Sequence, residues 1–140
     1  MSEANRALVR TFFATADREG RIPESLCAPG FTAHIAGYPP MDLGAFQQFV
    51  GVFYAAFAGF THDLEDLLVE GDRVAFRAVA RATHTAAFMG VPASGKPVSV
   101  PTIGVARLVG GQVAEWWNSP DQLGLLQQLG ALPALSHEAA

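Results

Sequence analysis

The sequence predicts an α+β fold, in which N-terminal helices pack over the open face of a cone-shaped, curved antiparallel sheet (an α+β barrel). Apolar residues recur at helical spacing up to Gly59, and from Thr61 onward the period changes to two. Gly-Asp and Gly-Gly pairs separate the alternating runs, as hairpin turns do. Helices that precede a run of strands are typical of a helical layer packed on one sheet.

Length and composition restrict the class of protein. The 140 residues fit one domain over 1–140, with an ordered core expected over about 5–132. Half the residues are hydrophobic and the net charge is −4, which argues against a disordered tail and a nucleic-acid partner. No apolar run reaches the ~18 residues of a membrane span, and the polar N-terminus is unlike a signal peptide. The single cysteine, Cys27, closes no internal disulfide, which fits a cytoplasmic protein.

Two long helices are expected first. One spans 5–18, and the other begins after an N-cap at Asp42 and ends before Gly59. A turn-rich connector over 22–30 and a strand over 31–38 lie between them. The second helix carries a wide apolar stripe made of Leu43, Phe46, Phe49, Val50, Phe53 and Phe57.

Four strands and a short helix are expected to follow. The strands span 64–70, 73–88, 98–109 and 113–117, and a loop covers 90–97. The segment Ser-Pro-Asp-Gln at 119–122 predicts a capping box, with Ser119 as the N-cap of a final helix that ends at Gly130.

Alternation along the two longest strands predicts a cavity. Arg77 and Arg81 mark the outward positions of one strand, and Arg107 marks those of the next. The inward positions are then Phe76, Ala78, Ala80, Ala82, His84, Val100, Thr102, Gly104, Ala106 and Leu108. The small residues among them leave space, which either a ligand or the phenylalanines of the second helix would fill. Ala80→Phe or Gly104→Leu is expected to fill this space without unfolding the protein.

Asp121 and His84 are the candidate catalytic residues. His84 faces inward among small side chains, where it is either a hydrogen-bonded core residue or an acid–base group. Asp121 would lie near the pocket mouth if Trp117 faces inward. As an acid in the first turn of a helix, Asp121 also interacts favourably with the helix dipole. This structural role alone would account for an acidic residue at that position.

Candidate substrate contacts come from the expected walls of the cavity. Trp117 and the phenylalanines of the second helix would form an apolar wall. The candidate substrate-binding residues are Trp117, His34, Phe53, Phe76, Thr102 and Ser119. Alternation points His34 outward unless a bulge intervenes, and His62 and His137 are interpreted as surface residues. No His or Cys pair has metal-ligand spacing, so no metal site is expected.

Four segments match one family in the right order along the chain. They are Phe-Thr-Ala-His at 31–34, Glu-Gly-Asp-Arg-Val at 70–74, the His-Thr to Gly-Lys segment at 84–96, and Asp-Gln-Leu-Gly-Leu-Leu-Gln-Gln-Leu-Gly at 121–130. The sequence thereby resembles the SnoaL-like polyketide cyclases of the nuclear-transport-factor-2-like superfamily, over roughly residues 5 to 132. The resemblance implies the cone-shaped fold and, without metal or cofactor, ring closure of an aromatic polyketide ester by intramolecular aldol condensation. It also places the family's acid/base carboxylate at Asp121.

The chain departs from the family pattern at two points. Trp116 stands where the family often has His, and Ala86-Ala87 replaces Gly-Glu. Related sequences include hydroxylases and epoxide hydrolases. An epoxide hydrolase of this superfamily would need an Asp-Arg-Asp cluster in the pocket, whereas alternation turns Arg77 and Arg81 outward.

Residues and resemblance together favour a cofactor-independent acid–base enzyme acting on a small, apolar carbonyl compound. The alternatives are a non-catalytic module that binds an apolar ligand, a hydroxylase-like or epoxide-hydrolase-like relative on the same fold, and a purely structural dimerisation domain. A homodimer, or a higher homo-oligomer, is expected through the outer sheet face, because Val79, Ile103 and Val105 lie there among the arginines.

Overall fold

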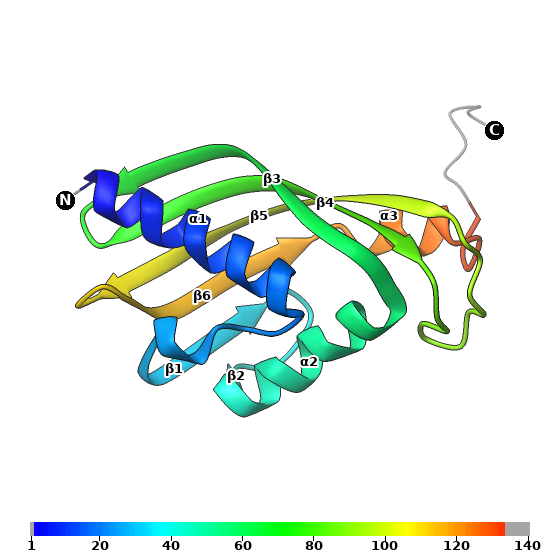
Figure 1. Cartoon of the computed structure of the whole chain (residues 1–140), viewed down its shortest axis with the longest axis horizontal. Coiled ribbons are helices and arrows are strands. Elements are labelled where there is room, and N and C mark those ends of the chain that lie inside the picture. The colour runs from blue at the N-terminus through cyan, green and yellow to red at the C-terminus, as the bar shows by residue number, and fades with distance from the viewer. Residues whose placement is uncertain (1, 134–140) are drawn as a thin grey trace.

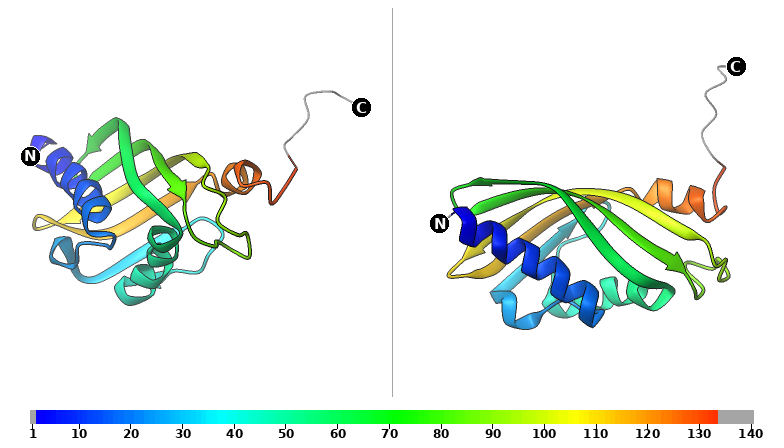
Figure 2. Two further views of the ribbon diagram at one scale, coloured as in Figure 1. Left: turned by 45° about the vertical axis from the view of Figure 1, so that its right-hand side comes forward. Right: turned by 45° about the horizontal axis from the view of Figure 1, so that its top comes forward.

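The computed structural model describes residues 2–133 and consists of helices packed on a curved sheet (Figure 1). Its elements are α1 (Ser2–Glu19), a short 3-10 helix η1 (Glu24–Leu26), β1 (Cys27–Ile35), β2 (Met41–Asp42), α2 (Leu43–Ala56), β3 (Phe57–Glu70), β4 (Arg73–His84), β5 (Pro97–Val109), β6 (Gln112–Pro120) and α3 (Gln122–Gln128). Helices α1 and α2 lie on the same, concave side of the sheet, while α3 continues from the end of β6 (Figure 2). None of the helices within 2–133 is long and apolar enough to cross a membrane.

The sheet confirms the α+β class but corrects the predicted strand directions. Its six strands run in the order β2-β1-β6-β5-β4-β3, and the sheet is open, not closed into a barrel. β1 pairs with β6 in parallel, while the other neighbours are antiparallel. The prediction of a wholly antiparallel sheet was therefore wrong at this pair. Alternation reveals which residues share a face, but it contains no information about which distant strand becomes the neighbour.

Several element boundaries differ from those predicted. Asp42 caps α2 as expected, since its Oδ1 accepts a hydrogen bond from the Ala45 N–H at 2.8 Å. β3 begins at Phe57, directly after α2, and not near residue 64. The cap of α3 is Asp121, because Ser119 and the following proline still belong to β6. The N-cap therefore lies two residues later than predicted, and the expected capping box does not form, because the residue three positions after Asp121 is Gly124.

Two bulges change which side chains face inward. In β3, Leu64 pairs with Ala78 while Asp66 pairs with Arg77, which leaves one extra residue, Glu65, on β3. In β6, Val113 pairs with Leu108 while Glu115 pairs with Arg107, so Ala114 is extra. After this second bulge Trp116 is buried on the inner side, and its neighbour Trp117 turns to the outer face. The predicted inward orientation of Trp117 was wrong for this reason.

Aromatic side chains fill the half of the fold beneath α1. Trp116 packs between Phe12 and Phe76, with ring centroids 4.8 and 4.7 Å away. A Cβ at Gly104 would lie 2.5 Å from Cζ of Phe76 and still closer to the carbonyl oxygen of Trp117. The space expected beside Gly104 is therefore already filled, and Gly104→Leu does not fit. The inner positions of β4 are buried as predicted, but of its three inward alanines only Ala80 borders open space.

Candidate functional site

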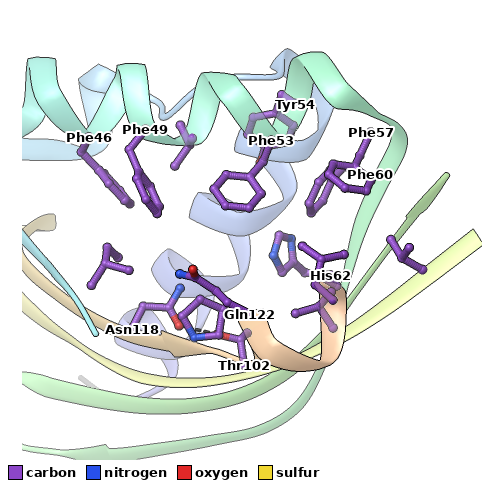
Figure 3. Close-up of a pocket in the computed structure, with 17 residues that line it drawn as sticks. Phe46, Phe49, Phe53, Tyr54, Phe57, Phe60, His62, Thr102, Asn118 and Gln122 are labelled. Carbon is purple, nitrogen blue, oxygen red and sulfur yellow. Dashed lines mark hydrogen bonds between the residues drawn. The ribbon is translucent and has the colours of Figure 1, made fainter. Parts of the chain in front are cut away.

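A cavity of about 130 Å³ lies between α2 and the inner face of the sheet (Figure 3). Its size is close to that of an engineered apolar cavity of ~150 Å³ that accepts benzene, so it holds roughly one ring. Six aromatic side chains form one wall, namely Phe46, Phe49, Phe53, Tyr54, Phe57 and Phe60. The sheet closes the opposite side with residues that include Ala80, Val98, Val100 and Thr102.

The described part of the chain contributes few polar groups to the cavity, and none of them is a carboxylate. Within residues 2–133, the polar side chains that line it are Tyr54, His62, Thr102, Asn118 and Gln122. Helix α2, β3, β5, β6 and the start of α3 each supply one of them. No three metal-ligating side chains lie together anywhere in the described part of the chain. Any chemistry in this cavity therefore starts from an imidazole, a phenol, a hydroxyl and two amides.

The imidazole of His62 forms a hydrogen bond with the buried carboxylate of Asp17. Its Nδ1 lies 2.9 Å from both Oδ1 and Oδ2 of Asp17 in α1. The side chains of His62 and Asp17 are only 15% and 11% exposed. Because a carboxylate accepts and does not donate, Nδ1 carries the proton of this hydrogen bond. The lone pair is then on Nε2, and nothing within 2–133 forms a hydrogen bond with that atom.

Tyr54 binds the same carboxylate. Its hydroxyl donates to Oδ1 of Asp17 at 3.0 Å. Burial, and then the negative charge of Asp17 and this hydrogen bond, raise the pKa of Tyr54 well above its usual value of 10.0. The phenol therefore stays protonated and remains a donor. Phe13 packs against the imidazole of His62 at 4.8 Å between ring centroids, which fixes the ring against α1.

The sequence interpretation missed this cluster of Asp17, His62 and Tyr54. His62 was expected on the surface, whereas its side chain is largely buried and lines the cavity, so that expectation was wrong. The alternation of Phe60, His62 and Leu64 with polar residues was a usable signal for an inward histidine. The strand predicted over 64–70 begins after His62 and therefore excludes it from the inward positions.

Asp121 does not face the cavity. It is exposed, and its Oδ1 accepts a hydrogen bond from the Gly124 N–H at 2.9 Å as the N-cap of α3. Its expected position at the pocket mouth depended on an inward Trp117, which the bulge in β6 turns outward. The structure accounts for Asp121 by capping, and its catalytic role remains a prediction.

His84 is fully buried but lies outside the cavity lining. Its Nδ1 is 2.9 Å from Oγ of Ser94 and accepts the Ser94 N–H at 3.2 Å. Its ring packs against Phe57, with centroids 5.2 Å apart. Its Nε2 is buried and has no hydrogen-bond partner within 2–133. This arrangement matches a core histidine that holds the 85–96 loop, and its role in catalysis likewise remains a prediction.

The six candidate substrate contacts are dispersed. Phe53 and Thr102 line the cavity, whereas Phe76 is part of the aromatic core beneath α1. His34, Trp117 and Ser119 lie on the outer face, where the imidazole of His34 stacks on Trp117 with centroids 5.1 Å apart. The outward direction that alternation indicated for His34 agrees with this position.

A second histidine–carboxylate pair occupies that outer face. Nε2 of His34 lies 2.9 Å from Oε2 of Glu115, and Arg107 donates to Oε1 of Glu115 at 2.9 Å. The hydrogen bonds from His34 and then Arg107 lower the pKa of Glu115 below its usual value. This pair resembles Asp17 and His62 in its contacts, but it lies on the opposite side of the sheet from the cavity.

A family model and several solved structures match the chain. The model of the SnoaL-like polyketide cyclases matches residues 7–129. The candidate hydroxylase AclR from Streptomyces galilaeus is 26% identical, with a TM-score of 0.88 over 98% of this chain and 87% of AclR. The candidate polyketide cyclase IdmH from Streptomyces antibioticus is 30% identical, with a TM-score of 0.75 over 93% of this chain and 99% of IdmH. A search of curated protein sequences finds no match.

The chain belongs to the SnoaL-like polyketide cyclase family. The match begins within α1 and covers α2, the six strands and α3, and therefore includes every described residue that lines the cavity. A cyclase-like function follows from this membership, and the reaction and its substrate are inferred below from the chain's own residues.

Proposed function

We propose that this protein is a cofactor-independent acid–base enzyme that closes a ring in an apolar carbonyl substrate by intramolecular aldol condensation. The observation that carries the proposal is the Asp17–His62 pair, which presents an unoccupied Nε2 to an apolar cavity. A histidine oriented by a buried carboxylate is a recurring arrangement for a general base near neutral pH. The similarity to candidate polyketide cyclases supports a substrate of the polyketide type.

His62 is the catalytic base in this proposal. Its Nε2 takes a proton from the carbon next to a carbonyl group, and the C–H electron pair becomes the double bond of an enolate. The enolate carbon then attacks a second carbonyl of the same molecule, and the new alkoxide takes the proton back from His62. Atoms and electrons balance at this aldol addition, and loss of one water from its β-hydroxy carbonyl product completes the condensation without an oxidant.

Asp17 and Tyr54 are positioning residues for this base. The carboxylate fixes the proton on Nδ1 and stabilises the imidazolium that forms when Nε2 accepts a proton. Tyr54 holds the carboxylate in place from α2, since its hydroxyl remains a donor. Aromatic side chains keep water away, which strengthens each of these electrostatic interactions.

The experiment that tests this function is proton exchange on a single-ring aryl ketone in D₂O, followed by NMR. We expect saturable exchange of the protons next to the carbonyl, faster than free imidazole achieves at the same pH. A ketone that binds without any accelerated exchange would contradict the proposal and would favour a non-catalytic binding module.

A hydroxylase is the second candidate, because the similarity to AclR extends over 98% of this chain with a TM-score of 0.88. Hydroxylation of an aromatic polyketide consumes an oxidant, whereas aldol closure consumes none. Oxygen uptake during turnover of a polyketide substrate would therefore favour the hydroxylase over the cyclase.

We also propose a homodimer, or a higher homo-oligomer, formed through the outer sheet face, and a cytoplasmic location. Ile103 of β5 is 59% exposed on this face, and Leu68 of the edge strand β3 is 67% exposed. Burial of such residues against a second copy would remove apolar surface from water. The free, buried thiol of Cys27 supports a reducing compartment. Light scattering that finds a monomer at micromolar concentration would contradict the assembly.

A further inference from the structure

Two primary amides line the cavity on the side opposite the phenylalanines of α2. Asn118 lies near the end of β6 and Gln122 is the first residue of α3. Figure 3 shows both amide groups projecting toward the cavity from that side. An amide can donate or accept, so the partners of its oxygen decide what it offers to a ligand.

The oxygen of Asn118 is already bound. The hydroxyl of Thr102, which is only 6% exposed, donates to Oδ1 of Asn118. This contact turns the oxygen toward the sheet, and the Nδ2 group then faces the cavity (Figure 3). Within 2–133, no side chain or carbonyl accepts a hydrogen bond from Nδ2 of Asn118.

Gln122 is held in a similar way by Tyr38, which lies outside the cavity lining. The hydroxyl of Tyr38 donates to Oε1 of Gln122 at 3.2 Å. The ring of Tyr38 packs edge-on against Phe49 of α2, with centroids 4.9 Å apart. The nitrogen Nε2 of Gln122 also has no acceptor in the described part of the chain. Both amides therefore present N–H donors to the cavity.

We propose that Asn118 and Gln122 bind the carbonyl oxygen of the substrate and stabilise the enolate oxygen that forms from it. This inference rests on the proposed function, and it names the oxyanion donors and the class of substrate. When His62 removes the proton, the π electrons of the carbonyl move to its oxygen, where the amide donors meet the new negative charge.

The chemistry of the lining selects a neutral ketone or ester. Donors without a neighbouring acceptor recognise an oxygen that only accepts, which is a carbonyl oxygen. No Lys or Arg among residues 2–133 lines the cavity, so a carboxylate would lose its hydration without a compensating charge. A cavity of about 130 Å³ holds one ring, and the remainder of a larger polyketide would extend beyond it.

Infrared spectroscopy of a bound ketone tests the donors without any turnover. The probe is acetophenone labelled with ¹³C at its carbonyl carbon, because a hydrogen-bonded carbonyl absorbs at a lower frequency than a free one. We expect a lowered frequency in the wild type and in His62→Gln. Asn118→Leu and Gln122→Met should each raise it, and Thr102→Val should raise it because the Asn118 amide is no longer held. Gln112→Met, which alters an amide outside the cavity, is the control.

The kinetic expectation is that loss of one donor slows α-proton exchange by ~10²-fold. A bound probe with the frequency of an apolar solvent, or an unchanged frequency in both amide variants, would overturn the inference. If Asn118→Leu fails to fold, Gln122→Met still tests whether loss of one amide donor raises the carbonyl frequency of the bound probe. A lowered frequency with no exchange in the wild type would reject the proposed function and leave the carbonyl site intact.

Discussion

Both carboxylate oxygens of Asp17 in α1 lie 2.9 Å from Nδ1 of His62 in β3. This contact joins the N-terminal helix to the inner face of the sheet, and it determines which imidazole nitrogen is available to the cavity. The proposed acid–base centre therefore depends on how α1 packs across the strands. It does not depend on the C-terminal segment 121–130, which resembles the family.

Asp17→Asn should slow turnover by ~10²–10⁴-fold, because the amide cannot stabilise the imidazolium of His62. The free energy of unfolding should fall by only ~1–2 kcal/mol, since the Asn oxygen can still accept a hydrogen bond from Tyr54. NMR should show loss of the downfield Nδ1–H signal of His62. The control is Asp63→Asn, which alters a carboxylate paired with Arg81 at 2.8 Å on the outer face. Equal effects of the two changes would argue against a positioning role for Asp17.

The raised pKa of Tyr54 predicts a specific alkaline response. The fold favours the neutral phenol, so this contribution to stability is fully present below about pH 10 and is lost progressively as the pH rises further. The stability of the wild type should therefore fall more steeply above about pH 10 than that of Tyr54→Phe. Denaturant titrations across this range measure the difference. Parallel pH dependence in the two proteins would show that the Tyr54 hydroxyl is not held as described.

Asp121→Asn separates capping from catalysis. Asn is as good an N-cap as Asp, so the stability should change by less than ~1 kcal/mol. The carboxylate points away from the cavity, and we expect near-wild-type turnover. A loss of ~10²–10⁴-fold in rate at unchanged melting temperature would instead restore Asp121 as the acid–base residue.

Ala80→Phe and Gly104→Leu should behave in opposite ways, although both enlarge an inward side chain. Ala80 borders the cavity, so a phenyl ring enters open space, ligand binding is blocked and the melting temperature changes little. Gly104 is packed against Phe76 and the Trp117 carbonyl, so Leu overpacks the core and destabilises the protein by ~1–3 kcal/mol or more. Thermal melts with ligand titration distinguish them. Unfolding of Ala80→Phe would indicate that the space beside Ala80 is not open.

Local patterns predicted the elements, while contacts distant in sequence decided the site. Alternation placed Thr102 on the inner face of β5, and the stripe of α2 placed Phe53 toward the sheet. The parallel pairing of β1 with β6 joins segments some eighty residues apart, and no periodicity encodes it. One extra residue, Ala114, reversed the orientation expected for Trp117.

The sequence did not predict His62 as the candidate base for a similar reason. Asp17 and His62 are 45 positions apart, on a helix and a strand whose mutual packing the sequence pattern does not specify. An Asp in an amphipathic helix is expected on the solvent side, and here its carboxylate is buried because a histidine and a tyrosine both donate to it. The resemblance to the family instead indicated Asp121 as the acid–base residue. The hydrogen bond that Asp121 accepts from the Gly124 N–H, as the N-cap of α3, is enough to account for an aspartate at this position.

The most direct test of the account compares two histidines that have the same kind of partner. His62 and His34 each lie 2.9 Å from a carboxylate, but only His62 faces the cavity. The measurement is the rate of α-proton exchange of a single-ring aryl ketone in His62→Gln and His34→Gln, with folding checked by circular dichroism. The account predicts a loss of ~10²–10⁴-fold in His62→Gln and an unchanged rate in His34→Gln. Full exchange activity in folded His62→Gln would contradict it.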